Sequence, residues 1–557
     1  MKNSIPTSEI RFDSKIVSSL EKVFSNRTPR HEEYKNSVLL GERLNFQIVC
    51  KNEEENDSFK RLNICVRGAL AQYVRLRTVD YVPATLPPSR HDDYYVGLEP
   101  SLYPDVLSEM TELGLVLPFG LWRAVWISVD IPKDFVAGEY VIFFDLTKRD
   151  GEIVTTLRYE VEILPLACEK PSIVLTNWMH YDCIAQQHGL EPFTDEYYEV
   201  FAEYLKAYVD CGFNMLLIPL FTPPLDTQRG GERKTCQLVK VVCKEFEYEF
   251  DFSRLEKFLR FVEKRGVKYF EFCHLYTQWG GEAAPKVLAD KNGETKKIFG
   301  WETPSDEGEY VRFISCFLEE LTTFIKTHGW ENRSYFHLTD EPRPEHAQRY
   351  AKLREIVKSK IGDMSIMDAI SSYEFYQKGL IDTCVVCTDK IDEFLDHNAT
   401  DIFAYTCCEQ TDGYLSNRLM HMPSERTRVL GLQLYLNDIK GFLHWGFNFY
   451  NTFHSVAPIN PYLTNDAGGQ FPSGDSFIVY PKKNGVCMSL RAETVKESFQ
   501  DYAALQLLQS YIGRDEVVKM LINEGMYRFG TYPKDMNWYA DIRRKLNERL
   551  KAVCAKE

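Results

Sequence analysis

The strongest constraint on the fold is a series of short apolar segments that alternate with amphipathic helical segments between residues 172 and 447. This alternation is typical of a parallel sheet, because parallel strands need a crossover connection, usually a helix. Eight such segments predict a (β/α)8 barrel with several enlarged loops. The expected strands are 172–179, 213–221, 267–275, 334–340, 364–370, 382–387, 401–407 and 440–447, and the expected helices include 195–210, 253–265, 309–328 and 345–359.

The segments on either side of this region have different patterns. Residues 36–167 contain six β-rich runs broken by turn residues, which predicts a β-sandwich. Beyond residue 493 the chain is polar and helical. We therefore predict an α/β protein with an N-terminal β-sandwich at 1–168, a (β/α)8 barrel at 169–512, and a helical C-terminal extension at 513–557 packed on the barrel.

Charge and composition restrict the partners. The net charge of −15 argues against a nucleic acid or an anionic membrane as the main partner, because both would repel an acidic surface. The N-terminal segment lacks the apolar core of a signal peptide, and no apolar run approaches a membrane span. The 15 cysteines are scattered through apolar segments, as expected for reduced thiols. We expect a soluble cytoplasmic protein, compatible with a homo-oligomer.

The candidate catalytic residues are Asp340 and Glu341, which follow the fourth expected strand in "YFHLTDEP". Active sites of (β/α)8 barrels lie at the carboxyl ends of the strands. Pro342 is expected to hold Glu341 in an extended conformation and to stop the strand. Asp-Glu dipeptides at 195–196, 306–307, 392–393 and 515–516 lie in helical or loop segments and are interpreted as solvated surface. The alternative for the pair itself is a helix-capping Asp and a surface Glu.

Two carboxyls crowded into one pocket are expected to titrate apart, one ionised and one protonated at neutral pH. A glycosidase needs such a pair. Because the residues are adjacent, the usual separations of the two-carboxylate mechanisms are not expected, which favours attack by a 2-acetamido group of the substrate itself. In that scheme Glu341 protonates the leaving oxygen and Asp340 accepts a hydrogen bond from the acetamide N–H.

Other strand ends supply the expected walls of a sugar pocket. Trp445 is the candidate stacking floor, with Asn448 and Tyr450 reaching sugar hydroxyls, and Tyr405 is a candidate donor to an acetamide carbonyl. The alternative for Trp445 and Tyr405 is core packing, and for Asn417, Arg418 and Asp475 it is a surface salt bridge. The remaining substrate-binding candidates are His274, Gln278, Trp279, Asn417, Arg418 and Asp475.

Other chemistries lack their motifs. The sequence has no GxSxG, Walker A, HExxH or GxGxxG motif in a suitable context. Cys384 and Cys387 form a CxxC, but neither a second CxxC nor a pair of histidines follows at ligand spacing. We expect neither a metal nor a cofactor.

Longer motifs resemble glycoside hydrolase family 123. They are "LWRAVWISVDIPKDFVAGEY", "LIPLFTPPLDT", "LYTQWGG", "FGWET", "FHLTDEP", "RVLGLQLYLNDIKGFLHWGFNFYN" and "GDSFIVYPKKNGVCMSLRAETVKESFQDYAALQLL", so the resemblance covers nearly the whole chain. It implies a retaining β-N-acetylgalactosaminidase that uses neighbouring-group participation, with the family's Asp-Glu pair at Asp340 and Glu341. The chain departs from the characterised enzymes in its long loop after the third strand and in Tyr450, where Trp is common.

Two other functions stay open at this point. One is a catalytically silent carbohydrate-binding protein that uses the same groove. The other is a glycosidase of the same fold that acts on a sugar without a 2-acetamido group. The sequence leaves the sugar, the linkage and the aglycone undetermined.

Overall fold

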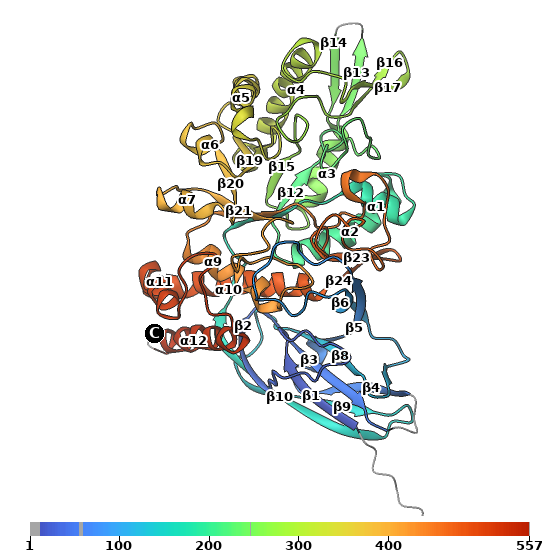
Figure 1. Ribbon diagram of the computed structural model, residues 1–557, viewed down its shortest axis with the longest axis vertical. Coiled ribbons are helices and arrows are strands. Elements are labelled where there is room, and N and C mark those ends of the chain that lie inside the picture. Colours follow the sequence, from blue (N-terminus) through green and yellow to red (C-terminus); the bar gives the residue numbers. More distant parts are fainter. Residues whose placement is uncertain (1–11, 55–58, 245–246, 556–557) are drawn as a thin grey trace, which may run out of the picture.

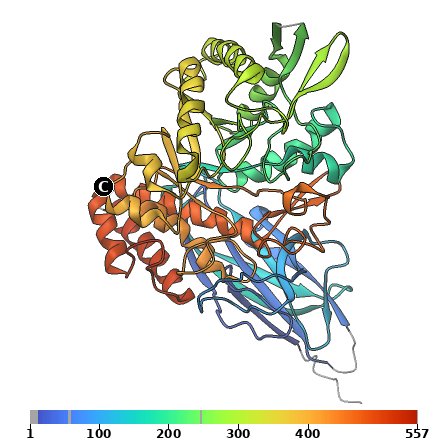
Figure 2. The same cartoon turned by 45° about the horizontal axis from the view of Figure 1, so that its top comes forward.

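The computed structural model describes residues 12–54, 59–244 and 247–555. A β-rich region forms one end of the molecule and a parallel barrel the other, with the C-terminal helices beside the junction (Figures 1 and 2). No helix in the described ranges has both the length and the apolar character needed to cross a membrane.

The β-rich region consists of two five-stranded sheets. Strands of both sheets contribute to one buried apolar cluster. In this cluster Phe46 of the first sheet stacks on Tyr159 of the second, with ring centroids 3.8 Å apart. The first sheet has the order β1 (Phe12–Ser18), β3 (Arg43–Asn52), β8 (Trp122–Asp130), β5 (Val74–Ala84), β6 (Ser101–Glu109), and the second β2 (Lys35–Leu40), β10 (Ile153–Ala167), β9 (Gly138–Thr147), β4 (Phe59–Arg67), β7 (Leu115–Pro118).

Strand β3 is buried on both faces, which explains its nearly continuous apolar sequence. Phe46 and Ile48 face the second sheet, whereas Val49 belongs to the apolar cluster that extends into the barrel. Because successive side chains of a strand point to opposite faces, the first sheet packs between the second sheet and the rest of the molecule. The β-rich region therefore shares a core with the barrel.

The barrel has eight parallel strands, as predicted from the alternating pattern. Their order is β11 (Val174–Asn177), β22 (Gly441–His444), β21 (Phe403–Thr406), β20 (Thr383–Cys387), β19 (Ser365–Ile370), β18 (Ser334–Phe336), β15 (Tyr269–Phe272), β12 (Met215–Ile218). Strands β11 and β12 do not form a ladder. Asn214 links them instead, since its side chain accepts from Leu175 N at 2.9 Å and donates to Ile173 O at 2.9 Å. The barrel is thus nearly closed.

The outer helices also follow the predicted pattern. They include α2 (Asp195–Asp210), α3 (Ser253–Glu263), α4 (Gly308–Thr327) and α5 (Ala347–Ile361). Thr194 caps α2 by accepting a hydrogen bond from Tyr197 N. The other connections carry shorter helices, namely α1 (Tyr181–His188), α6 (Tyr373–Gln377), α7 (Ile391–Asp396), α8 (Ser424–Arg428) and α9 (Leu430–Leu436).

The enlarged loops after β12 and β15 fold together into a small sheet that the sequence pattern did not predict. Its order is β14 (Glu247–Asp251), β13 (Lys240–Lys244), β16 (Val287–Lys291), β17 (Glu294–Phe299). In Figure 1 this sheet lies at the end of the molecule farthest from the β-rich region. A hairpin of β23 (Val479–Lys482) and β24 (Gly485–Met488) follows the loop after β22.

The C-terminal part is helical and comprises α10 (Leu490–Ile512), α11 (Arg514–Asn523) and α12 (Met536–Cys554). Helix α12 lies against α10 and also against the second sheet. Arg543 of α12 pairs with Asp501 of α10 and with Glu42 beside β3, both at 2.7 Å. The last helix therefore contacts the β-rich region as well as the helices of the barrel.

A buried ion pair joins α10 to the first sheet. Glu493 is fully buried and lies 2.7 Å from the Arg77 guanidinium and 3.4 Å from that of Arg43. Burial opposes the charge of Glu493, but Arg77 and Arg43 outweigh it and lower the pKa of Glu493 to about 2. The Glu493→Gln substitution would leave these guanidinium groups without their central anion.

We expect Glu493→Gln to lower the free energy of unfolding by about 3 kcal/mol at pH 7, since removal of one partner leaves a buried charge without its counter-ion. The pKa of Glu493 is depressed in the folded state, so its contribution is complete above the unfolded pKa of about 4.3 and is lost as the pH falls toward 2. Urea unfolding at pH 7 and at lower pH measures both effects. The exposed Glu516 of α11 offers the control, and equal stability of Glu493→Gln and Glu516→Gln would contradict the prediction.

Candidate active site

The segment that carries the carboxylate pair leaves the barrel sheet earlier than predicted. Strand β18 ends at Phe336 rather than at residue 340. On the β15 side the hydrogen bonds continue, because Leu275 N donates to His337 O at 3.0 Å and Tyr276 N to Leu338 O at 2.9 Å. On the β19 side the Asp368 carboxylate, instead of a backbone carbonyl, accepts from Leu338 N at 3.2 Å. A side chain thus replaces the strand ladder directly before the pair.

The chain turns sharply at Glu341. Its φ is +43°, in the left-handed region, so the expectation of an extended backbone before Pro342 was wrong. A non-glycine residue in this region is strained by about 1–3 kcal/mol, and surrounding contacts must hold it. The preceding residues supply them, since Trp279 N donates to Asp340 O at 3.0 Å and the Thr339 hydroxyl to Thr277 O at 2.7 Å. Because adjacent side chains of an extended strand point to opposite faces, the Asp340 and Glu341 side chains can converge only if the chain turns here.

The two carboxyls have different hydrogen-bond partners. Gln278 Nε2 donates to Asp340 Oδ2 at 2.9 Å, and the Tyr405 hydroxyl donates to Glu341 Oε1 at 2.6 Å. An amide N–H only donates, so its contact favours an ionised Asp340. A phenol both donates and accepts, so its contact is compatible with either protonation state of Glu341.

Burial raises the pKa of both carboxyls. For Asp340 burial, followed by the neighbouring Glu341 charge, raises the pKa to about 7. For Glu341 burial raises the pKa against the opposing effect of the Tyr405 hydroxyl. Because neither group ionises readily beside the other, the pair is expected to retain a proton near neutral pH. This is the arrangement that general acid catalysis needs.

The Tyr405 hydroxyl offers a first test of this assignment. Its hydrogen bond lowers the pKa of Glu341, so Tyr405→Phe should raise that pKa further. If Glu341 acts as a protonated acid, the alkaline limb of the kcat/KM profile should move to higher pH in the variant, with a rate loss of about tenfold or less. The pH profile measures the shift. A limb that moves to lower pH would contradict the assignment.

A second group of predicted residues meets beside β22. Trp445 Nε1 donates to Asp475 Oδ2 at 2.8 Å, and the indole contacts Phe449 and Phe471 edge to face. Asp475 is fully buried, and burial raises its pKa to about 7. Arg418 donates to the backbone carbonyls of Gly446 and Asp475. These contacts fix the orientation of the Trp445 ring.

Three predicted residues use their polar atoms within the loops. The Asn448 amide bridges the backbone of His180, at 2.9 and 3.0 Å. The Tyr450 hydroxyl donates to Val479 O at 2.9 Å, and Asn417 donates to Cys407 O at 2.8 Å. All three are buried, so the structure places them as supports of the strand-end loops.

The residues after β15 have a different character. Trp279 is 42% exposed, and His274 is fully buried with both ring nitrogens unpaired in the part of the chain that the structure describes. Gln278 Oε1 and both polar atoms of the Asn177 side chain also lack partners there. Since buried polar groups are rarely left unsatisfied, these atoms are candidates for contact with a polar ligand.

The sequence analysis missed a set of charged residues in the barrel interior. Glu271, His337 and Asp368 are fully buried and lie on neighbouring segments of β15, β18 and β19. A charged residue within a buried apolar strand is costly unless it is paired. The letters "FEFCH", "YFHL" and "IMDAI" carry that signal, which could have identified all three residues.

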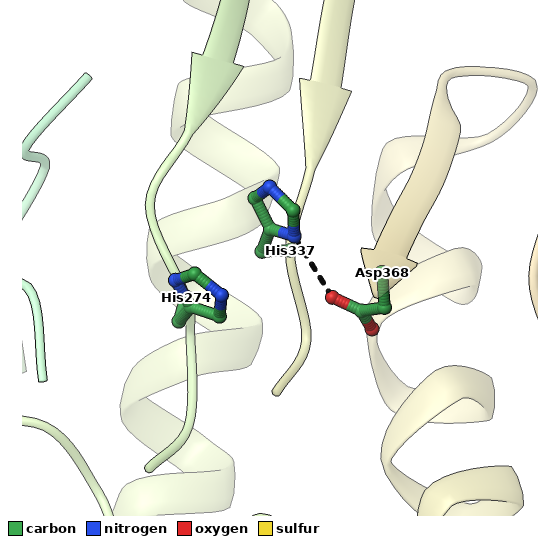
Figure 3. A group of neighbouring side chains, drawn as sticks. All are labelled: His274, His337 and Asp368. Atoms are coloured by element: carbon green, nitrogen blue, oxygen red, sulfur yellow. Dashed lines mark hydrogen bonds and ion pairs between the residues drawn. The ribbon is translucent and has the colours of Figure 1, made fainter. Parts of the chain in front are cut away.

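Among the described residues, the ligand atoms of His274, His337 and Asp368 lie within 4.8 Å of one another, the spacing of a metal centre. Figure 3 shows the His337 ring directed at the Asp368 carboxylate. Both ring nitrogens of His337 are engaged by carboxylates, and the His274 ring stacks on that of His337 at 4.3 Å and 13°. Stacked rings direct their lone pairs in parallel, so this geometry favours a hydrogen-bonded network over a metal centre.

A cavity of about 790 Å³ lies on the opposite side of the barrel, between α2, α10 and the segment that enters β11. Its walls include Glu42, Lys170, Asp210 and Lys496. Asp210 and Lys496 pair with each other at 2.7 Å. The cavity faces the amino ends of the strands, away from the carboxylate pair.

Two adjacent carboxyls, one buried and one half-buried, at the carboxyl end of a parallel eight-stranded barrel are an arrangement found in glycoside hydrolases. The model of "Glycoside hydrolase 123, catalytic domain" matches residues 178–508. This match covers more than half of the chain, which therefore belongs to glycoside hydrolase family 123. Among curated protein sequences, none matches this chain.

A solved structure of a glycoside hydrolase agrees with the fold. A family 123 glycoside hydrolase from Clostridium perfringens, described in work on glycolipid glycan hydrolysis, has a TM-score of 0.75 and 15% sequence identity, with 98% of each chain covered. The β-glucuronidase of Parabacteroides merdae has a TM-score of 0.30 and 12% identity over 89% of this chain and 51% of its own. The endo-β-1,4-mannanase of Thermotoga petrophila has a TM-score of 0.35 and 12% identity over 60% and 77%.

Proposed function

We propose that this glycoside hydrolase is a retaining exo-β-N-acetylhexosaminidase, with β-linked N-acetylgalactosamine as the favoured sugar. The observation that carries the proposal is the presence of two adjacent carboxyls, the buried Asp340 and the half-buried Glu341, on one turn at the carboxyl end of the barrel. We assign the reaction to the barrel at 169–512, supported by the sandwich at 1–168 and the helical extension at 513–557.

The adjacency of the pair argues for a nucleophile supplied by the substrate. In the two-carboxylate mechanisms the two groups act on opposite sides of the scissile bond, about 5–9.5 Å apart. Because the two residues share a single turn, we expect both side chains on the same side of the bound sugar, where neither is placed to attack from the far face. A 2-acetamido oxygen reaches the anomeric carbon from that face.

The steps follow from the charges of the pair. Glu341 donates its proton to the glycosidic oxygen while the acetamide oxygen bonds to the anomeric carbon, and the leaving alcohol departs. Asp340 accepts a hydrogen bond from the acetamide N–H and stabilises the positive charge that spreads over the acetamide. Glu341, now ionised, removes a proton from water, which opens the oxazoline ring. Two inversions at the anomeric carbon give net retention.

The rest of the proposed pocket is assigned from the strand ends. Trp445, fixed by Asp475, is the floor on which the sugar ring stacks. Gln278 Oε1 and the two ring nitrogens of His274, which have no partner within the described part of the chain, are candidates for contacts with sugar hydroxyls. We also assign Tyr405, whose hydroxyl donates to Glu341, as a donor to the acetamide carbonyl. Since the Clostridium perfringens enzyme is described with glycolipid glycans, we propose glycans of glycoconjugates as the substrate class.

The test compares aryl β-glycosides of N-acetylgalactosamine, N-acetylglucosamine and galactose, and follows the product anomer by NMR. We expect turnover of the N-acetylgalactosaminide, a β product and inhibition by the matching thiazoline. Equal turnover of the galactoside without thiazoline inhibition would instead favour a glycosidase that needs no 2-acetamido group. Binding of the sugars with no turnover would favour a silent carbohydrate-binding protein.

A further inference from the structure

His337 lies in the barrel interior, three residues before Asp340, and joins two carboxylates. Its Nδ1 lies 2.9 Å from Asp368 Oδ1 and its Nε2 lies 2.7 Å from Glu271 Oε1. All three side chains are fully buried. Figure 3 shows the contact between His337, directly after β18, and Asp368 on β19.

Both carboxylates accept additional hydrogen bonds. Glu271 accepts from Trp178 Nε1 at 2.6 Å and from the Thr176 hydroxyl at 2.5 Å. Asp368 accepts from the Tyr350 hydroxyl at 2.6 Å and from the backbone N–H of Leu338. Burial raises the pKa of Asp368, and its hydrogen bonds with His337 and Tyr350 oppose that rise. Both nitrogens of His337 therefore meet acceptors, and only the imidazolium donates with both.

The electrostatics agree with this geometry. Burial opposes a charge on His337, but the hydrogen bonds to Asp368 and Glu271 raise its pKa to about 9. Burial, and then the charge of His337, lower the pKa of the stacked His274, which stays neutral. Among the described residues, Glu271 and His274 from the β15 segment and Asp368 from β19 contact His337, and Asp340 interacts with it electrostatically. The Tyr350 hydroxyl of α5 is bonded to Asp368.

We propose that His337 is a positioning residue that stays cationic, bridges the Glu271 and Asp368 carboxyls, and thereby both fixes the turn before Asp340 and favours the ionised form of Asp340. The first effect acts through Asp368, whose carboxylate binds the backbone N–H groups of Leu338 and Thr339. The second is the attraction between the imidazolium and the Asp340 carboxylate, which lowers the pKa of that carboxyl. The inference rests on the proposed role of Asp340 as an ionised group.

The first test needs no substrate. In protein labelled with ¹⁵N-histidine, the His337 resonances, identified by their loss in His337→Gln, should show two protonated nitrogens at pH 8. In Glu271→Gln one acceptor loses its charge, so His337 should lose its second proton by pH 8. A neutral His337 in the wild type at pH 7 would overturn the inference.

The second test measures the acid limb of kcat/KM, which reports the ionisation of Asp340 in the free enzyme. Without the cation the pKa of Asp340 rises, so His337→Gln should move this limb upward by about one pH unit. His328→Gln, at the end of α4 on the outside of the barrel, is the matched control and should leave the limb in place. Thermal unfolding of each variant confirms that it is folded.

The substrate for this profile is whichever aryl glycoside the wild type hydrolyses fastest. The test therefore remains valid if the enzyme prefers a sugar other than N-acetylgalactosamine. A folded His337→Gln variant with an unshifted acid limb would overturn the positioning role. If His337→Gln does not fold, Glu271→Gln is measured instead. In that variant His337 should lose its second proton between pH 6 and 8, and this loss should add a new inflection to the pH profile of kcat/KM. A profile of that variant without the inflection would equally overturn the role.

Discussion

Glu341→Gln is expected to reduce kcat/KM roughly a thousandfold for glycosides with poor leaving groups, because the proton donor is lost and general acid catalysis of this kind contributes about 10²–10⁴-fold. The amide keeps the shape of the side chain and its contact with Tyr405. For a nitrophenyl glycoside the loss should be smaller, since a good leaving group departs without protonation. Initial rates across a series of aryl leaving groups measure this dependence.

The chain carries a matched control for this experiment. Asp195 and Glu196 form another Asp-Glu dipeptide, exposed at the start of α2. Glu196→Gln makes the same chemical change outside the barrel mouth and should leave all rates unchanged. If Glu341→Gln lost the same factor for every leaving group, Glu341 would not be the acid.

Asp340→Asn is expected to reduce kcat/KM for the N-acetylhexosaminide by about 10²–10³-fold, since the variant lacks the charge that stabilises the developing oxazolinium ion. The amide still accepts a hydrogen bond but carries no charge. Thiazoline inhibition should weaken in parallel, because that inhibitor resembles the cyclised intermediate. The acid limb of the pH profile, which follows a carboxyl whose pKa is raised to about 7, should disappear.

Here the control is Asp195→Asn, at an aspartate whose side chain is 93% exposed. It should retain wild-type rates, inhibition and pH dependence. An Asp340→Asn variant that kept its acid limb would assign that limb to another group, for example Asp475, whose pKa burial also raises to about 7.

The barrel strands were predictable because their pattern is local. The segment 382–387 is a short apolar run, and β20 occupies 383–387 as expected. The predicted end of the fourth strand was wrong, because a side chain there accepts the hydrogen bond that a neighbouring strand would otherwise accept. The segment 334–340 was expected to be extended throughout, whereas Asp368 binds the backbone N–H of Leu338 and β18 ends at Phe336.

The sequence predicted where the candidate site residues lie along the chain better than it predicted which way their side chains point. Position follows from the rule that strand ends meet at one face of a barrel, and this rule located Asp340, Tyr405 and Trp445. Orientation in an irregular loop has no sequence period. Asn448 and Tyr450 were therefore expected to face a sugar, but their polar atoms bind the backbone of His180 and Val479.

The sequence by itself determined the eight barrel strands and the strand end that carries Asp340 and Glu341, because apolar periodicity and the Asp-Glu-Pro motif are properties of neighbouring residues. The tertiary structure alone decided the left-handed turn at Glu341 and the contact of His337 with Glu271 and Asp368. The two contacts of His337 join residues that are 31 and 66 positions apart in the sequence. The free energy that holds such a strained turn and such buried charges comes from contacts between distant segments, which no local pattern encodes.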